Sequence, residues 1–321
     1  MEHPRIAYVL DPRFPGGTSS AVAEELRAIV PVAQPTVHAV TSGMFSGQGV
    51  APPLANAFDD LGIEPVWDAP TIAADMVILH NPSFLKFDAT LGRRIVTRHL
   101  IVVTHENFLR PGGVEGFDVR GCLDRIDRDT LALRKSLVPV SAHNRVTVSD
   151  WLVANVLPDG WLVLPDDWFN ICTFEMSAPT AAPRDRRGRH SRPGLEKFPP
   201  RATLDLCFPA FAEANVILGA EVLVAEGGPP HWQLHPFRGL ELDRYFEMID
   251  FMVYFTAPTW QESFGRVLAE GIAAGKVVIS DPATAAGFDG GVIAAKPEDV
   301  DGIIAFLVSH PAPYASQVPQ G

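Results

Sequence analysis

Two glutamates, Glu262 and Glu270, have a spacing that suggests chemistry. The apolar run 251–255 before them is typical of a buried strand, because aromatic and β-branched side chains favour strands. Apolar side chains after Phe264 recur at helical spacing. A strand, a short polar loop and a helix place a helix N-terminus at the carboxyl edge of a sheet, where free N–H groups can bind an anion. We therefore predict a phosphate-sized site flanked by the two carboxylates.

The residues around this helix start supply the predicted contacts. The amide groups of Phe264, Gly265 and Arg266 would face the anion, next to Ser263 in the polar loop. Glu270 lies away from the apolar stripe of the helix and is free to face a ligand. A surface helix that carries two glutamates by chance would show the same spacing.

The segment from Glu262 to Glu270 resembles the Glu-x7-Glu signature of retaining glycosyltransferases with the GT-B fold, in particular family 4. Ser263-Phe264-Gly265 and the small-residue helix 269–275 fit the same pattern. The resemblance implies an α/β protein of two Rossmann-like doubly wound domains that face each other across a cleft. It implies transfer of a sugar from a nucleotide-diphosphate sugar with retention of configuration, Glu270 holding the ribose hydroxyls and Glu262 the sugar hydroxyls.

A basic segment supplies candidate cations for the donor diphosphate. Gly188-Arg189 followed by Lys197 resembles the pair that opens the second domain of this family and holds the diphosphate. Arginine offers a planar fork and lysine a compact charge, a combination that suits a diphosphate. Arg192 lies nearer the usual distance from Lys197, so the choice between Arg189 and Arg192 stays open.

The first half of the chain supplies a glycine loop and a histidine. Gly16-Gly17 after the first apolar run resembles the family's Gly-Gly loop beside the donor, although a tight turn capped by the following Thr or Ser would use the same residues. His105 ends an apolar run, and ligands lie beyond the carboxyl ends of strands in an open α/β sheet. The resemblance implies that His105 contacts the donor sugar. His80 ends the preceding predicted strand and is the alternative candidate for this role.

Other chemistries lack their motifs. The chain has neither Gly-x-Gly-x-x-Gly nor a P-loop, and no Gly-x-Ser-x-Gly elbow. No Asp-x-Asp follows an apolar run, and the resemblance implies cations and helix ends in place of a divalent metal. We expect no cofactor and no metal, only a nucleotide-diphosphate sugar as donor, UDP- or GDP-linked, with an acceptor that the sequence does not identify.

Composition narrows the class of protein. The 321 residues are 47% hydrophobic and 20% charged, enough apolar residues for sizeable cores. The formal net charge of −12 argues against nucleic-acid partners. No apolar run approaches the roughly 18 residues of a spanning helix, so no transmembrane segment is expected. Three scattered cysteines favour a reducing, cytoplasmic setting.

The alternation of apolar runs and helical patterns predicts two domains, 1–170 on the acceptor side and 171–321 on the donor side. The predicted strands are 6–10, 37–40, 76–79, 100–103 and 137–140, then 204–207, 221–225, 251–255, 277–280 and 292–294. The predicted helices are 19–29, 53–61, 84–98 and 119–134, then 209–218, 242–249, 264–275 and 297–308. The Pro-rich tail 311–321 is expected to be irregular.

Two further classes of function stay open at this point. One is a degenerate GT-B protein that binds a nucleotide sugar or a partner without catalysis, because the chain is shorter than typical relatives. The other is a different enzyme on the same scaffold, a sugar phosphorylase or a nucleotide-sugar epimerase.

Overall fold

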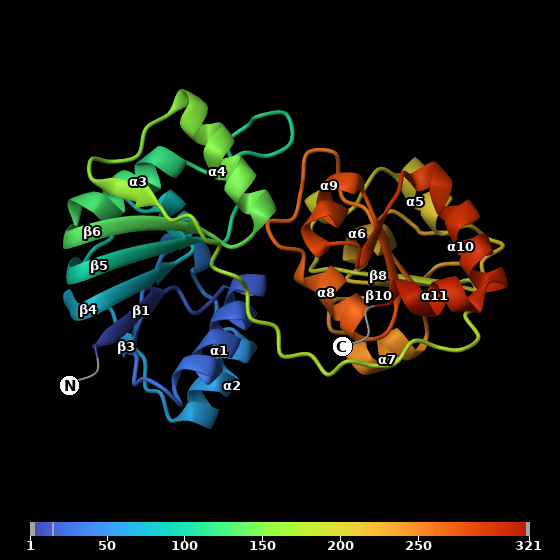
Figure 1. The fold of residues 1–321 in the computed structure, drawn as a ribbon, viewed down its shortest axis with the longest axis horizontal. Coiled ribbons are helices and arrows are strands. Elements are labelled where there is room, and N and C mark those ends of the chain that lie inside the picture. The colour runs from blue at the N-terminus through green and yellow to red at the C-terminus, as the bar shows by residue number, and fades with distance from the viewer. Residues whose placement is uncertain (1–3, 15, 319–321) are drawn as a thin grey trace. The chain divides into compact units, whose positions relative to one another are not determined.

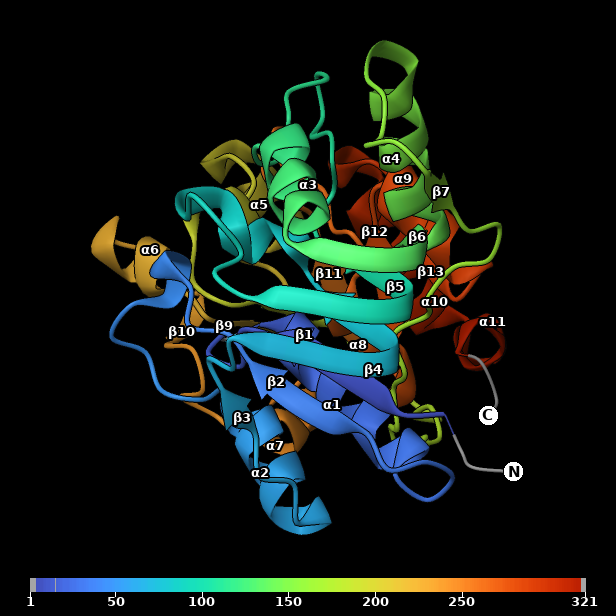
Figure 2. The same ribbon diagram turned by 90° about the vertical axis from the view of Figure 1, so that its left-hand side faces the viewer.

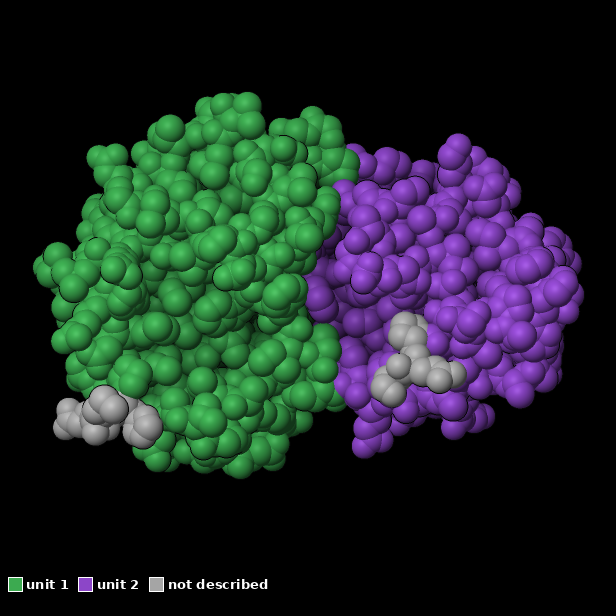
Figure 3. All heavy atoms as spheres, viewed as in Figure 1, with its two compact units in different colours: residues 1–173 green, residues 174–321 purple. Residues whose placement is uncertain are grey.

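The computed structural model describes residues 4–14 and 16–318. The chain divides into two compact units, Met1–Thr173 and Phe174–Gly321, which Figure 3 shows in different colours. Each unit has its own parallel sheet and its own apolar cores.

The first unit is built on a seven-stranded sheet in the order β3-β2-β1-β4-β5-β6-β7, and its described strand pairs are parallel. Figure 2 shows β6, β5 and β4 stacked in that order. The strands are β1 (Ile6–Leu10), β2 (Thr36–Ala39), β3 (Val66–Trp67), β4 (Thr71–His80), β5 (Arg94–Thr104), β6 (Thr130–Pro139) and β7 (Trp161–Val163).

Helices cover both faces of this sheet (Figures 1 and 2). α1 (Gly17–Ile29) and α2 (Pro52–Leu61) pack through residues such as Val22 and Leu54 on one face. α3 (Val119–Arg128) and α4 (Ala142–Ala154) pack through residues such as Leu123 and Trp151 on the other. This two-sided cover makes the first unit doubly wound, as predicted.

The second unit is built on a six-stranded parallel sheet in the order β10-β9-β8-β11-β12-β13. Its strands are β8 (Arg186–His190), β9 (Ala214–Leu218), β10 (Gln233–His235), β11 (Phe251–Tyr254), β12 (Val277–Ser280) and β13 (Val292–Ala294). Its helices are α5 (Arg201–Cys207), α6 (Glu221–Ala225), α7 (Leu242–Glu247), α8 (Arg266–Ala273), α9 (Pro282–Ala285), α10 (Val300–Ser309) and α11 (Pro311–Gln317). α5 and α10 pack on one face, and α7 and α8 on the other.

Several predicted elements are wrong in the first half of the second unit. Residues 204–207 and 221–225 were expected to be strands and form α5 and α6, and the expected helix 209–218 contains β9. The cause is β8, whose sequence Arg-Arg-Gly-Arg-His is polar although the strand is buried. A polar strand gives no apolar run, so the elements after it were assigned one step out of phase.

Three other predicted segments also differ. The expected helix 119–134 ends at Arg128 as α3, and β6 begins at Thr130. The expected helix 84–98 is a short turn followed by β5, which begins at Arg94. The expected irregular tail contains α11, which begins at Pro311, where a proline needs no hydrogen bond for its nitrogen. Residues 319–321 of that tail lie outside the described residues.

Candidate active site

Lys197 and Glu262 meet in the second unit. Lys197 ends a 3-10 turn, Leu195–Lys197, and its Nζ donates to Glu262 Oε1 at 2.5 Å. Tyr254 Oη donates to the same oxygen at 2.6 Å, and Trp260 Nε1 lies 3.4 Å from it. The three contacts converge on Oε1, and Oε2 accepts no hydrogen bond from the described residues. The predicted sugar carboxylate and the predicted diphosphate cation are therefore direct partners.

The electrostatics of this pair follow from burial and from charge. Burial alone would raise the pKa of Glu262, but the Lys197 ammonium and the hydrogen bonds from Lys197, Tyr254 and Trp260 lower it overall. Burial lowers the pKa of Lys197, and Glu262 opposes that change. The Lys197 Nζ also lies 4.6 Å from the centroid of the Trp260 ring. We conclude that the aromatic walls and the ion pair together keep a charged lysine in a nearly buried position.

Arg189 is enclosed within the second unit. Its guanidinium lies between the rings of Phe198 and Tyr254, 4.3 and 4.7 Å from their centroids. It donates to the backbone carbonyl of Lys197 and, at 3.1 Å, to that of Phe255. The side chain thus ties the turn that carries Lys197 to the end of β11. Contact between Arg189 and a diphosphate stays a prediction, whereas Arg192 is half-buried and pairs with Glu196.

The helix start predicted as an anion site is formed by α8. Gly265 is the N-cap, with φ of 88° and ψ of 43°, a left-handed conformation that glycine adopts without strain. No side chain in the described residues caps this helix. Ser263 and Phe264 lie in the loop just before the cap, and Arg266 is the first helical residue. The predicted loop-to-helix geometry is present.

Glu270 lies on the second turn of α8. Its Oε1 accepts from Arg266 Nε at 3.2 Å, and its Oε2 is 3.5 Å from His190 Nε2. Burial raises the pKa of Glu270, and the Arg266 guanidinium opposes that rise. His190 ends β8, and burial lowers its pKa to about 4. Glu270 is thus hydrogen-bonded to Arg266 and lies near a neutral His190, whose Nε2 has no hydrogen-bond partner among the described residues. Contact of Glu270 with a ribose stays a prediction.

In the first unit, the glycine pair lies where β1 leads into α1. Gly16 is the N-cap and α1 begins at Gly17. The expectation that Thr18 or Ser19 caps the helix is wrong, because Ser19 Oγ donates to the Phe14 carbonyl at 2.6 Å. A Cβ on Gly16 would meet the Phe14 ring at 2.6 Å, whereas a Cβ on Gly17 would meet nothing within 4 Å. Pro15 lies outside the described residues.

His105 and His80 are partners rather than rivals. His80 is the last residue of β4, and His105 follows the end of β5, the next strand of the sheet. His80 Nδ1 and His105 Nε2 are 2.9 Å apart. Burial lowers the pKa of His80 to about 3, and burial together with His80 lowers the pKa of His105 well below its ordinary value. Both rings are neutral at pH 7.

Several residues that contact these side chains were not predicted from the sequence. Tyr254 and Trp260 line the Lys197–Glu262 pair, and Tyr8, Glu25 and Trp168 surround His80. Tyr254 offered a signal, because it is the last residue but one of a predicted strand, 251–255, and so lies near the ligand edge of the sheet. Glu25 and Trp168 offered none, since only the packing of α1 and of the segment after β7 brings them to His80.

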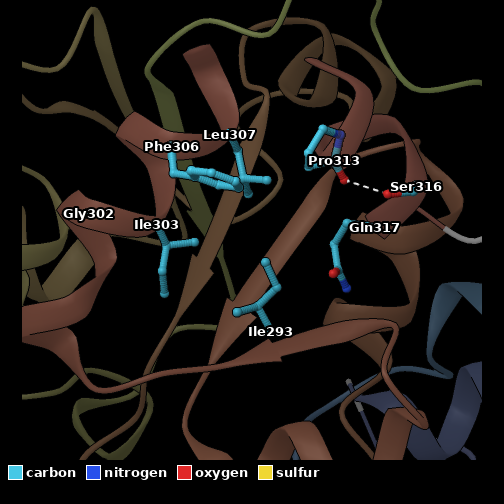
Figure 4. A pocket seen from close by; sticks show the side chains of 8 residues that line it. All are labelled: Ile293, Gly302, Ile303, Phe306, Leu307, Pro313, Ser316 and Gln317. Carbon is cyan, nitrogen blue, oxygen red and sulfur yellow. Dashed lines mark hydrogen bonds between the residues drawn. The ribbon is translucent and has the colours of Figure 1, made fainter. Parts of the chain in front are cut away.

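An apolar pocket of about 450 Å³ lies elsewhere in the second unit, between β13, α10 and α11. Figure 4 shows Phe306 and Leu307 on one side and Gln317 on the other, with Ser316 bonded to the Pro313 carbonyl. None of the predicted donor residues lines it.

In the part of the chain that the structure describes, no group of three or more His, Cys, Asp or Glu is placed to hold a metal ion. No helix within residues 4–14 and 16–318 is both long and apolar enough to cross a membrane.

Solved structures share this architecture at low sequence identity. Anabaena HepE in complex with UDP-glucose is 15% identical, with a TM-score of 0.63 over 98% of this chain and 92% of that chain. Sucrose-phosphate synthase from Thermosynechococcus elongatus is 13% identical, with a TM-score of 0.58 over 98% and 92%. An alpha-glucosyltransferase in complex with UDP-glucose and DNA containing an abasic site is 14% identical, with a TM-score of 0.55 over 99% and 93%. Neither a family model nor a curated protein matches the sequence. The chain has the GT-B fold, as predicted.

Proposed function

We propose that the protein is a retaining, metal-independent glycosyltransferase that uses a nucleotide-diphosphate sugar, with UDP as the favoured carrier. The GT-B fold supports this proposal, as do the similar structures that were solved with UDP-glucose. The second unit would bind the donor and the first unit the acceptor. The net charge of −12 favours an acceptor other than a nucleic acid.

The Lys197–Glu262 pair is the observation that carries the proposal. A buried ion pair adds little stability, because the cost of desolvating two charges offsets their attraction. This pair nevertheless stands beside the N-terminus of α8, with Lys197 held by Trp260 and Glu262 by Tyr254. An ammonium next to a carboxylate with one open oxygen suits a ligand that has a phosphate at one end and hydroxyls at the other.

Each residue has a proposed role in the transfer. Lys197 and the amides at the start of α8 bind the diphosphate and stabilise the charge that develops as it leaves. Glu262 accepts hydrogen bonds from sugar hydroxyls, Glu270 from the ribose, and His105 contacts the sugar from the first unit. The bond from the anomeric carbon to the diphosphate breaks as the acceptor oxygen bonds on the same face. The acceptor proton passes to the departing phosphate oxygen.

A second candidate is a GT-B protein that binds a nucleotide sugar without transferring it. The enclosure of Arg189 favours this candidate, because the guanidinium acts on the protein's own carbonyls. A protein of this kind would keep the donor site and lack turnover.

A donor panel tests the proposal. The protein is screened by thermal shift against UDP, GDP, ADP and their glucose conjugates, and the stabilising donor is then incubated with a mixture of candidate acceptors. We expect stabilisation by UDP and UDP-glucose and slow release of UDP, with the anomeric configuration of the product read by proton NMR. Stabilisation without UDP release would favour the binder. A requirement for inorganic phosphate would indicate a phosphorylase, and a product epimerised within the sugar would indicate an epimerase.

A further inference from the structure

We propose that Glu25 and His80 are positioning residues that fix the tautomer of His105, so that its outer nitrogen accepts a hydrogen bond from a ligand hydroxyl. The tautomer follows from contacts inside the first unit. Only the identity of the hydroxyl, on a sugar or an acceptor, rests on the proposed function.

His80 sits in an aromatic box with 1% of its surface exposed. The Tyr8 ring stacks on it, with an interplanar angle of 7° and centroids 5.6 Å apart, and the Trp168 ring meets it edge-on at 6.5 Å. The imidazole therefore cannot rotate freely to exchange its two nitrogens. Its Nδ1 faces His105, and its Nε2 faces Glu25 on α1.

The walls of this box also hold Glu25. Tyr8 Oη donates to Oε1 at 2.7 Å, and Trp168 Nε1 donates to Oε2 at 2.9 Å. Both carboxylate oxygens are therefore acceptors, which fits the ionised form because an ionised carboxylate only accepts. Tyr8 and Trp168, which orient the His80 imidazole, thus also fix the position of the Glu25 carboxylate.

That charge decides which nitrogen of His80 carries the proton. Nε2 is 3.8 Å from Glu25 Oε2, and it is a buried nitrogen without a hydrogen-bond partner in the described residues. An N–H dipole toward a negative oxygen is favoured over a lone pair, and the effect is large where water is excluded. His80 therefore carries its proton on Nε2, and its Nδ1 is an acceptor.

The 2.9 Å contact then fixes His105. Because His80 Nδ1 accepts, His105 Nε2 must donate, and a neutral imidazole that donates through Nε2 has a lone pair on Nδ1. His105 is only partly buried, and its Nδ1 has no partner among the described residues. Glu25, His80 and His105 thus form a relay that presents one acceptor at the carboxyl edge of the sheet, suited to a hydroxyl donor.

Nitrogen-15 NMR of the full chain with labelled histidine tests the tautomers directly. Two-bond proton–nitrogen spectra distinguish a protonated Nδ1 from a protonated Nε2, and the spectra of His80→Gln and His105→Gln assign two signals among the ten histidines. We expect both residues in the wild-type protein to carry the proton on Nε2. A proton on Nδ1 of His105 would overturn the proposal without any variant of Glu25.

Substitutions at Glu25 test the cause. Glu25→Met removes the acceptor and should add a second His105 signal with Nδ1 protonated. Glu25→Gln should keep the wild-type tautomer, because the Trp168 N–H can only donate and so selects the carboxamide oxygen at the Oε2 position. Glu24→Met is the matched control, since Glu24 pairs with Arg27 on the same helix. Wild-type tautomers in Glu25→Met would overturn the role of Glu25.

The effect on ligand use is measured separately. Release of UDP from UDP-glucose should fall about tenfold in Glu25→Met, the scale of one lost hydrogen bond, and recover in Glu25→Gln. Absence of turnover in the wild-type protein would count against the proposed function alone, because the tautomers are read in the free protein. A tenfold loss in Glu24→Met as well would count against the relay.

Discussion

Lys197 and Glu262 show how one ion pair can serve two parts of a ligand. Each charge is nearly buried, so removing one partner leaves the other uncompensated, a change that typically costs about 3–5 kcal/mol. Tyr254 and Trp260 reduce that cost for Glu262 through their hydrogen bonds. The proposed roles of the two residues can therefore be distinguished by measuring nucleotide binding and sugar transfer separately.

We expect substitution of Lys197 to affect nucleotide binding and substitution of Glu262 to affect sugar transfer. Lys197→Met should weaken UDP binding by about 1–3 kcal/mol, because a charge-assisted hydrogen bond to phosphate is lost. Glu262→Gln should leave UDP affinity nearly unchanged and abolish sugar transfer. Calorimetric titration with UDP measures the first effect, and UDP release from the donor measures the second.

Lys276→Met is the matched control for Lys197→Met. Lys276 lies just before the start of β12, at the opposite edge of the same sheet from the carboxyl end of β11. UDP affinity should be unchanged in this variant. Equal losses in the two lysine variants would show that the effect on binding is not local to the Lys197–Glu262 pair.

At the scale of the element, β8 is the strand on which the second unit depends. Arg187 can be buried in it because its guanidinium pairs with Asp185 and Asp301, at 2.6 and 2.7 Å. Gly188 is required by packing, since a Cβ there would meet Ile249 at 2.6 Å and the Tyr245 hydroxyl at 2.7 Å. The glycine that the sequence associates with a diphosphate motif thus also lets α7 and the residues after it approach the sheet.

Two glycine substitutions test this packing. Gly188→Ala should lower the free energy of unfolding by about 1–3 kcal/mol through overpacking. Gly302→Ala, in the exposed part of α10 where a Cβ meets nothing within 4 Å, should raise it by up to about 1 kcal/mol. Urea unfolding followed by circular dichroism measures both. A neutral Gly188→Ala would contradict the close approach.

At the scale of the whole molecule, each unit buries a neutral histidine. Burial lowers the pKa of His80 to about 3 in the first unit and that of His190 to about 4 in the second, from an ordinary value of 6.5. A group whose folded pKa is depressed contributes stability above its unfolded pKa and loses it as the pH falls toward the folded pKa. Both units should therefore become less stable below about pH 6.5.

Each histidine should cost about 2 kcal/mol between pH 6.5 and pH 5, at 1.36 kcal/mol per pH unit. Burial raises the pKa values of Glu25 and Glu270, whose protonation opposes this loss, so the comparison is between variants. His80→Gln should flatten the pH dependence in the first unit and His190→Gln in the second. Hydrogen exchange read by mass spectrometry resolves the two units, and exposed His310→Gln is the control.

Much of the fold could be predicted where the buried residues of an element are also its apolar residues. Strands β1, β2, β4, β5 and β6 of the first unit and β11, β12 and β13 of the second each contain an apolar run, so their existence and their order along the chain follow from the residues, whereas the short strands β3 and β7 were not predicted. β8 could not be predicted in this way, and the apolar β9 was assigned to a helix because the polar strand before it was not recognised. The burial of Arg187 depends on Asp301, which is 114 residues away, and no local pattern records such a partner.

The residues and their order along the chain predict the loop and helix that carry Glu262 and Glu270, and the placement of His80 and His105 at strand ends. Those features follow from local periodicity and from the rule that parallel strands end at one edge. Only the tertiary structure shows that Arg189 is enclosed, that Lys197 pairs with Glu262, and that the Glu25 carboxylate lies next to Nε2 of His80. These contacts join residues far apart in the chain, where packing rather than spacing fixes the distance.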